Sequence, residues 1–271
     1  ETTMSKLKFS ANLEVLYYEL PWAERFAAAK KDGFQYVEFW GWEDKDLDEV
    51  KRLVAENGLT LSAMGGDGPF SMCDPANKQE YLDYLKRAIE AAKFVGTDTL
   101  IIHSDALQPS PQYAVPLSGD YSYTTKICTM FDILSTIAPW AEEAGITFVL
   151  EALNIVTDHL GNFLTDPRTG SELTSLTGSD NMKILYDVYH MYLNEGKIVE
   201  QTQKYLSSIG YMHIADAPGR AEPGTGVINY EKYFDFVADM GYDRVIGFEL
   251  YPSVSTEVAV AAIKKACGKH W

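Results

Sequence analysis

Cysteine is scarce in this chain: only three of its 271 residues are cysteines, and Cys73, Cys128 and Cys267 lie far apart. An odd, widely spaced set argues against a disulfide framework and is typical of proteins in a reducing compartment. Long apolar runs are absent too, since no stretch approaches the roughly 20 residues of a membrane span and the amino end lacks the pattern of a signal peptide. The sequence therefore predicts a cytoplasmic protein with no membrane partner.

Basic residues are also in short supply. Lys and Arg number 23 against 39 Asp and Glu, which gives a formal net charge of −16. Such a charge repels nucleic acid, so the expected partner is a small-molecule substrate. No linker or low-complexity segment divides the chain, which predicts one domain over residues 1–271. Residues 1–3, ahead of Met4, are expected not to belong to the native protein.

What the chain does contain is an alternation of short apolar runs and amphipathic segments. Several of the amphipathic segments show apolar residues at helical spacing and end at a glycine before the next run, as at Gly33, Gly58, Gly96 and Gly145. This alternation is typical of right-handed βαβ units. Eight units predict an α/β fold, a (β/α)₈ TIM barrel, with an open doubly wound sheet as the alternative. The predicted strands are 8–12, 35–39, 59–64, 98–103, 146–151, 182–187, 209–214 and 244–249.

Four of these runs end in a potential metal ligand. Because the carboxyl ends of barrel strands meet at one face, where the active sites of such barrels are built, we expect the four side chains to lie together. Three carboxylates and one imidazole suit one divalent ion, Mn²⁺ first, with Mg²⁺ or Co²⁺ as alternatives. Taken singly, each residue could instead cap the next helix. The predicted ligands are Glu151 in ITFVLE, Asp187 in MKILYD, His213 in YMH and Glu249 in VIGFE.

A cation in such a site would polarise a substrate that carries adjacent carbonyl and hydroxyl oxygens. Glu151 and Glu249 could then serve as a catalytic acid/base pair, which moves a proton between neighbouring carbons through an enediolate. Hydrolysis by a bound water is the chemical alternative at the same ion.

Further polar residues follow the strands and are candidate substrate contacts. Each also has a structural alternative: a packed histidine, a surface cation, a turn residue or a helix cap. The candidates are His190, Arg220, Asn154, His103 and Asp216. Two other features have a structural interpretation. The segment 65–68, GGDG, lacks the lysine and hydroxyl of a nucleotide-binding loop and predicts a tight turn. Trp40, just past the second strand, is more typical of packing than of a pocket wall.

Long motifs of the chain are similar to those of a known family. They are KFSANLEVLYYELP, LEALN around Glu151, YDVYHMYLNEG around Asp187, HIADAPGRAEPGTGVINY and FELYP around Glu249. Over nearly its full length the chain resembles the hydroxypyruvate isomerase family within the xylose-isomerase-like barrels. The resemblance implies a (β/α)₈ barrel, a metal-assisted enediol isomerisation and a dimer or tetramer. It also implies that Glu151 and Glu249 are the acid/base pair and metal ligands, that Asp187 is a ligand, that His190 contacts substrate and that Arg220 clamps its acidic end.

The fourth ligand departs from that pattern. Hydroxypyruvate isomerases have glutamine where this chain has His213, whereas the related ketose 3-epimerases have histidine. Those epimerases also place a glutamate six residues beyond the first ligand, where this chain has Thr157 followed by Asp158. Two functions therefore remain open: an isomerase of hydroxypyruvate or a related short sugar or sugar acid, and a ketose 3-epimerase of the D-tagatose or D-psicose type.

Two functions from other classes are less well supported. A metal-dependent DNA-repair endonuclease on the same barrel would gather several zinc ions and many histidines, and this acidic chain has five histidines. A catalytically silent sugar-binding barrel is disfavoured, because clustered buried carboxylates repel one another in the absence of a cation.

Overall fold

The eight predicted strands form a closed parallel barrel in the computed structural model, which describes residues 7–107 and 119–271. Each strand pairs with the next along the chain, and β8 returns to β1. This confirms the TIM-barrel prediction and overturns the open-sheet alternative, whereas residues 1–3 lie outside the described part. The strands are β1 Lys8–Asn12, β2 Tyr36–Phe39, β3 Thr60–Gly65, β4 Thr99–His103, β5 Thr147–Glu151, β6 Met182–Asp187, β7 Ile209–Ile214 and β8 Val245–Phe248.

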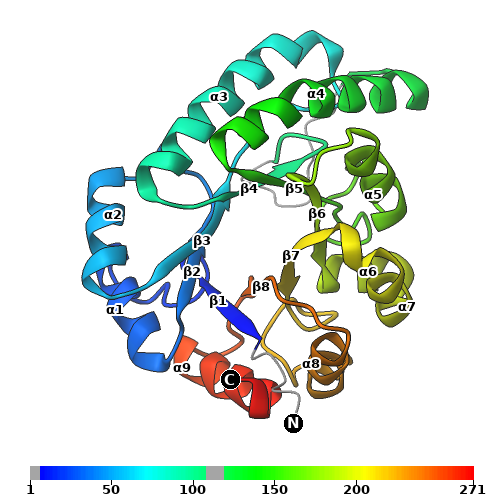
Figure 1. Ribbon diagram of the computed structural model, residues 1–271. Coiled ribbons are helices and arrows are strands. Elements are labelled where there is room, and N and C mark those ends of the chain that lie inside the picture. The colour runs from blue at the N-terminus through cyan, green and yellow to red at the C-terminus, as the bar shows by residue number, and fades with distance from the viewer. Residues whose placement is uncertain (1–6, 108–118) are drawn as a thin grey trace.

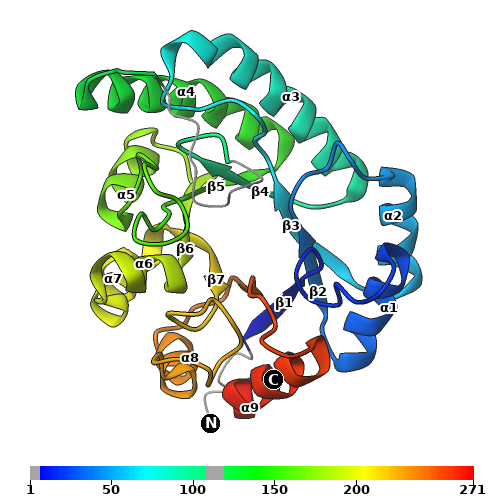
Figure 2. The ribbon, with the colours of Figure 1, turned by 180° about the vertical axis from the view of Figure 1, so that it is seen from behind.

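Helices surround the ring of strands, as Figures 1 and 2 show from opposite sides. The predicted glycine ends are confirmed at Gly33, Gly96 and Gly145, each of which has a positive φ and donates its N–H to the last turn of the helix. The α-helices are α1 Trp22–Asp32, α2 Leu47–Glu56, α3 Lys78–Val95, α4 Tyr123–Ala144, α5 Pro167–Leu176, α6 Val188–Glu195, α7 Ile198–Tyr205, α8 Tyr230–Asp239 and α9 Thr256–Cys267. Single 3₁₀ turns occupy Pro75–Asn77, Leu206–Ser208 and Gly268–His270.

The register of the strands brings the polar strand ends to one level. β4 and β5 pair so that His103 lies opposite Glu151, and β6 and β7 pair so that Asp187 lies opposite His213. Apolar side chains such as Phe148 fill the space between strands and helices and are fully buried. The barrel therefore holds these polar side chains on rigid strands whose outer faces pack against the helices in an apolar layer.

The barrel interior beneath that level contains a buried polar chain. The Tyr211 hydroxyl donates to Glu38 Oε2 and lies 2.8 Å from Ser62 Oγ, which in turn contacts Ser10 Oγ at 2.8 Å. Asn12 Nδ2 donates to Glu38 Oε1 over 3.2 Å. Buried polar groups are tolerated when they are hydrogen-bonded, and here the bonds fix the Glu38 carboxylate in place.

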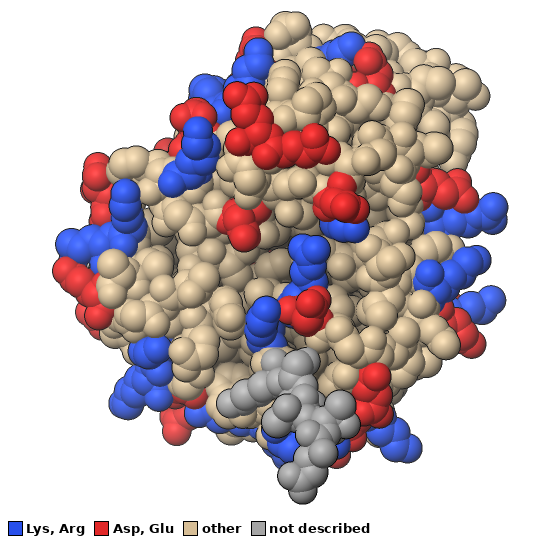
Figure 3. Space-filling view, in the orientation of Figure 1, with Lys and Arg blue, Asp and Glu red and all other residues tan. Residues whose placement is uncertain are grey.

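The molecular surface mixes charges of both signs. On the face shown in Figure 3, Lys and Arg side chains are interspersed with Asp and Glu around the periphery, so the negative excess is not gathered into one patch there. In the described ranges, none of the helices has the length and apolar character that crossing a bilayer requires.

Candidate active site

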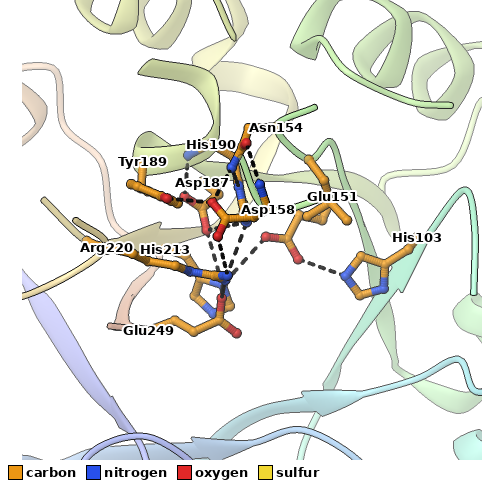
Figure 4. A network of polar contacts seen from close by, with 12 residues as sticks. His103, Glu151, Asn154, Asp158, Asp187, Tyr189, His190, His213, Arg220 and Glu249 are labelled. Atoms are coloured by element: carbon orange, nitrogen blue, oxygen red, sulfur yellow. Dashed lines mark hydrogen bonds and ion pairs between the residues drawn. The ribbon is translucent and has the colours of Figure 1, made fainter. Parts of the chain in front are cut away.

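The four predicted ligands converge on one point at the carboxyl ends of the strands (Figure 4). His213 Nδ1 lies 3.8 Å from Glu151 Oε1, 3.9 Å from Asp187 Oδ2 and 3.6 Å from Glu249 Oε2. All four side chains are buried. Atoms that share one cation at about 2.1 Å lie roughly 3–4 Å from one another. The geometry is therefore that of a ligand set.

The polar atoms at this point lack partners. Among residues 7–107 and 119–271, the buried atoms Glu151 Oε1 and His213 Nδ1 have no hydrogen-bond partner, which is costly for groups removed from water. Burial, followed by the charge of Glu151, raises the pKa of Asp187 to about 8. A divalent cation would satisfy the unpartnered atoms and offset the repulsion between the carboxylates. The side chains present thus fit a cation.

Local structure explains how Asp187 serves both as a helix cap and as a site residue. Its Oδ1 accepts the backbone N–H of His190 over 2.9 Å and so caps α6, as the structural alternative proposed. Its Oδ2 faces His213. The two interpretations of a strand-end carboxylate are therefore compatible.

Glu38 orients His213 from below. His213 Nε2 lies 2.8 Å from Glu38 Oε1, and both side chains are 1% exposed. A proton on Nε2, toward Glu38, would leave the Nδ1 lone pair for a cation once the ion displaces the proton that Nδ1 carries beside the three carboxylates. Burial alone would lower the pKa of His213, but the charges of Glu38 and Glu249 raise it well above its usual value.

His190 faces the same point as a hydrogen-bond donor. Asn154 Oδ1 accepts the backbone N–H groups of residues 156, 157 and 158, so the Asn154 amide nitrogen points the other way, 2.7 Å from His190 Nδ1. His190 Nδ1 is then the acceptor and Nε2 carries the proton. Ligand atoms of His190, Glu151, Asp187 and Glu249 also lie within 4.8 Å of one another. The imidazoles of His190 and His213 therefore both face the ligand point.

Arg220 places a cation beside the ligand set. Its Nη2 donates to Glu249 Oε2 over 3.1 Å, and its guanidinium lies 5.5 Å from the ring centres of Tyr189 and Tyr251. Its backbone φ of +57° is in the left-handed region, which is strained for a non-glycine residue. Within the described part of the chain, its buried Nε has no hydrogen-bond partner. Arg220 therefore has a donor available for an anionic group.

Two of the predicted substrate-contacting residues, His103 and Asp216, already contact other groups of the protein. His103 has Asp67 and Glu151 against its two ring nitrogens, at 3.1 and 2.9 Å. Burial alone would lower the pKa of His103, but these carboxylates raise it to about 10. Both oxygens of Asp216 accept backbone N–H groups of the loop that carries Arg220, namely those of Ala217, Gly224, Gly226 and Ile228. These hydrogen bonds indicate that Asp216 fixes the conformation of the loop. We had expected it to contact substrate.

The Asp216 loop gives a test of this arrangement. A Cβ on Gly226 would lie 2.0 Å from the Ala217 carbonyl oxygen, whereas a Cβ on Gly219 would meet nothing within 4 Å. We expect Gly226→Ala to lower the free energy of unfolding by about 1–3 kcal/mol and to reduce activity by displacing Arg220. Urea unfolding and steady-state kinetics measure both effects, with Gly219→Ala as the matched control. Equal behaviour of the two variants would contradict the role given to this loop.

Several site residues were not predicted as such. The Trp40 indole donates to Glu249 Oε1 over 2.7 Å, so Trp40 is a site residue as well as an aromatic near the second strand. Asp158 accepts from Asn154 Nδ2 at 2.7 Å and lies 3.8 Å from Arg220 Nη1, and the His159 ring lies 5.3 Å from that of His190. The signal available in the sequence was their position just after strands β2 and β5.

Fold and site together define a class: a TIM-barrel enzyme with a carboxylate and imidazole cluster at the carboxyl ends of its strands. The family model described as "Xylose isomerase-like TIM barrel" matches residues 26–266. Hydroxypyruvate isomerase of Escherichia coli (strain K12) is 32% identical over 264 residues, which cover 94% of this chain and 97% of that protein. The chain thus belongs to the xylose isomerase-like TIM barrel family, and within it to the hydroxypyruvate isomerase family, as its motifs predicted.

A second curated relative agrees on the isomerase class, and a solved structure agrees on the fold. A 2-oxo-tetronate isomerase of Cupriavidus necator is 29% identical over 269 residues, which cover 97% of this chain and 99% of that protein. The crystal structure of AP endonuclease, family 2, from Brucella melitensis superposes with a TM-score of 0.85 at 25% identity and covers 94% of this chain and 97% of that one. With these relatives the chain is an enzyme of the isomerase class.

Proposed function

We propose that the protein is a metal-dependent isomerase of a small hydroxy-carbonyl acid, either hydroxypyruvate or a related short sugar acid such as a 2-oxo-tetronate. The observation that carries the proposal is the convergence of Glu151, Asp187, His213 and Glu249 on one point, with unpartnered atoms of two of them facing it. Arg220 beside this point supports an anionic substrate, because its guanidinium can bind a carboxylate.

The four ligands would hold one divalent ion, for which Mn²⁺ is the first candidate and Mg²⁺ or Co²⁺ the alternatives. The bound ion supplies Lewis acidity to adjacent carbonyl and hydroxyl oxygens of the substrate, which acidifies the C–H bond between them. The donor set of three carboxylates and one imidazole contains no thiolate, which agrees with these ions.

Side chains of the protein would transfer the proton and bind the substrate. Glu249 and Glu151 are the carboxylates that can take and return the carbon-bound proton. His190 offers its Nε2 proton to a substrate oxygen, since its Nδ1 is occupied by Asn154. Arg220 would hold the acidic end of the substrate, and the burial of the cluster keeps water from the intermediate.

A ketose 3-epimerase is the second candidate. His213 favours it, because the resemblance places histidine at this position in the epimerases and glutamine in the hydroxypyruvate isomerases. Against it, residue 157 is Thr, and the neighbouring Asp158 is occupied by Asn154 and Tyr189. The endonuclease alternative is less well supported, since two imidazoles, those of His213 and His190, face the ligand point in the described site.

Turnover in D₂O with Mn²⁺ separates the candidates. We expect hydroxypyruvate to give an aldehyde signal by proton NMR and 2-oxo-tetronate to give its 3-oxo isomer, a ketone, each with deuterium at the carbon that receives the proton. D-Tagatose and D-psicose are the comparison substrates, because an epimerase would convert one ketose into a stereoisomeric ketose. Protein that binds Mn²⁺ but turns over no member of this panel would contradict the proposal.

A further inference from the structure

The side of Glu151 that faces away from the ligand point is held by a second acid-histidine pair. Figure 4 shows Glu151 between His103 and the remaining members of the cluster. His103 Nε2 lies 2.9 Å from Glu151 Oε2, and His103 Nδ1 lies 3.1 Å from Asp67 Oδ1. The side chains of His103 and Asp67 are each 10% exposed, and that of Glu151 is 4% exposed. The contact is therefore internal to the protein.

Further hydrogen bonds hold the Asp67 side chain in place. Its Oδ2 accepts the backbone N–H of His103 over 2.6 Å and the Tyr81 hydroxyl over 3.2 Å. The glycines on either side permit this approach, because a Cβ on Gly66 would lie 2.9 Å from Leu100 Cβ and one on Gly68 would lie 2.6 Å from the Tyr84 ring. The GGDG segment thus places Asp67 in close contact with the end of β4.

The chemistry of the three groups fixes the direction of their hydrogen bonds. Ionised carboxylates only accept, so both nitrogens of His103 donate, one to Asp67 and one to Glu151. Glu151 Oε2 is then engaged on the protein side. Glu151 Oε1, which has no hydrogen-bond partner in the described residues, is the oxygen that faces His213.

Glu249 is held differently. Trp40, which is 39% exposed, donates to its Oε1, and Arg220, whose side chain is 14% exposed, donates to its Oε2. Both Glu249 oxygens therefore accept a hydrogen bond, whereas Glu151 Oε1 has none from the described residues. His103 thus accounts for which oxygen of Glu151 is left to face the ligand point.

We propose that His103, held by Asp67, is a positioning residue that fixes Glu151 Oε2 and so turns Glu151 Oε1 toward the proposed cation. The inference rests on the proposed function.

Cation binding tests the inference without any substrate. We expect His103→Leu to weaken Co²⁺ and Mn²⁺ affinity by roughly 10–100-fold in calorimetric titrations and to change the visible absorption of the Co²⁺ protein. His103→Gln, whose amide can still donate to Glu151, should recover part of the affinity. His270→Gln is the matched control, because it removes another buried histidine that contacts a carboxylate, Asp235 at 2.7 Å, on α8.

The outcomes separate the inference from the proposed function. Unchanged Co²⁺ affinity and an unchanged spectrum in His103→Leu, with a parent protein that binds Co²⁺, would overturn the inference alone. A parent protein that binds neither ion would overturn the proposed function and the inference with it. Loss of affinity in His270→Gln as large as in His103→Leu would show a general folding defect and would also overturn the inference.

Discussion

A Glu249→Gln variant is expected to lose about 10³-fold in kcat with Mn²⁺ present at saturating concentration. The amide has nearly the shape of the carboxylate but cannot accept a proton from carbon, and general-base catalysis contributes about 10²–10⁴-fold. The single amide oxygen can accept from Trp40 or from Arg220 but not from both, so the Mn²⁺ titration must show that the variant still binds the ion. Steady-state kinetics with the best substrate of the panel, together with a Mn²⁺ titration, measures the effect.

The matched control is Glu222→Gln. Glu222 is a buried glutamate of the same rim, 2% exposed, whose carboxylate accepts from the Ser253 N–H and hydroxyl. Its loss should affect stability and leave the chemical step unchanged. If Glu249→Gln retained more than a tenth of the parent kcat with Mn²⁺ bound, Glu249 would not be the base.

The barrel could be predicted because each strand carries its own local signal. The runs at 146–151 and 182–187 are apolar, are bounded by turn residues and end in a carboxylate, and β5 and β6 occupy nearly these positions. Convergence of Glu151 and Asp187 then followed from the topology, since parallel strands present their carboxyl ends at one face. No long-range information was required for this step.

The groups behind the ligands could not be predicted in the same way. Glu38 lies inside an apolar run, and its contact with His213 joins residues 175 positions apart through the closure of the barrel. Asp67 has the sequence context of a tight turn, and only the packing of Gly66 and Gly68 against β4 and α3 brings it to His103. Such contacts depend on register and side-chain direction, which periodicity does not encode.

Removal of divalent ions is expected to abolish turnover, and the affinity of the protein for Mn²⁺ should rise with pH. Asp187 has a pKa raised to about 8 by burial and by the charge of Glu151, so below that pH the ion must displace a proton. His213 adds to the effect, because its pKa is also raised. Dialysis against a chelator, followed by Mn²⁺ titrations between pH 6 and 9, should show affinity increasing up to about pH 8 and then levelling.

The stability of the metal-free protein should change in the opposite direction. A carboxyl whose pKa is higher in the folded than in the unfolded state stabilises the fold at low pH and loses that contribution as pH rises from about 4 to about 8. The melting temperature without Mn²⁺ should therefore fall over this window, and the gain on adding Mn²⁺ should grow. Asp187→Asn, which cannot titrate at this position, should flatten the fall. A metal-free protein whose melting temperature rises between pH 5 and 8 would contradict the crowding of carboxylates on which the proposed cation site depends.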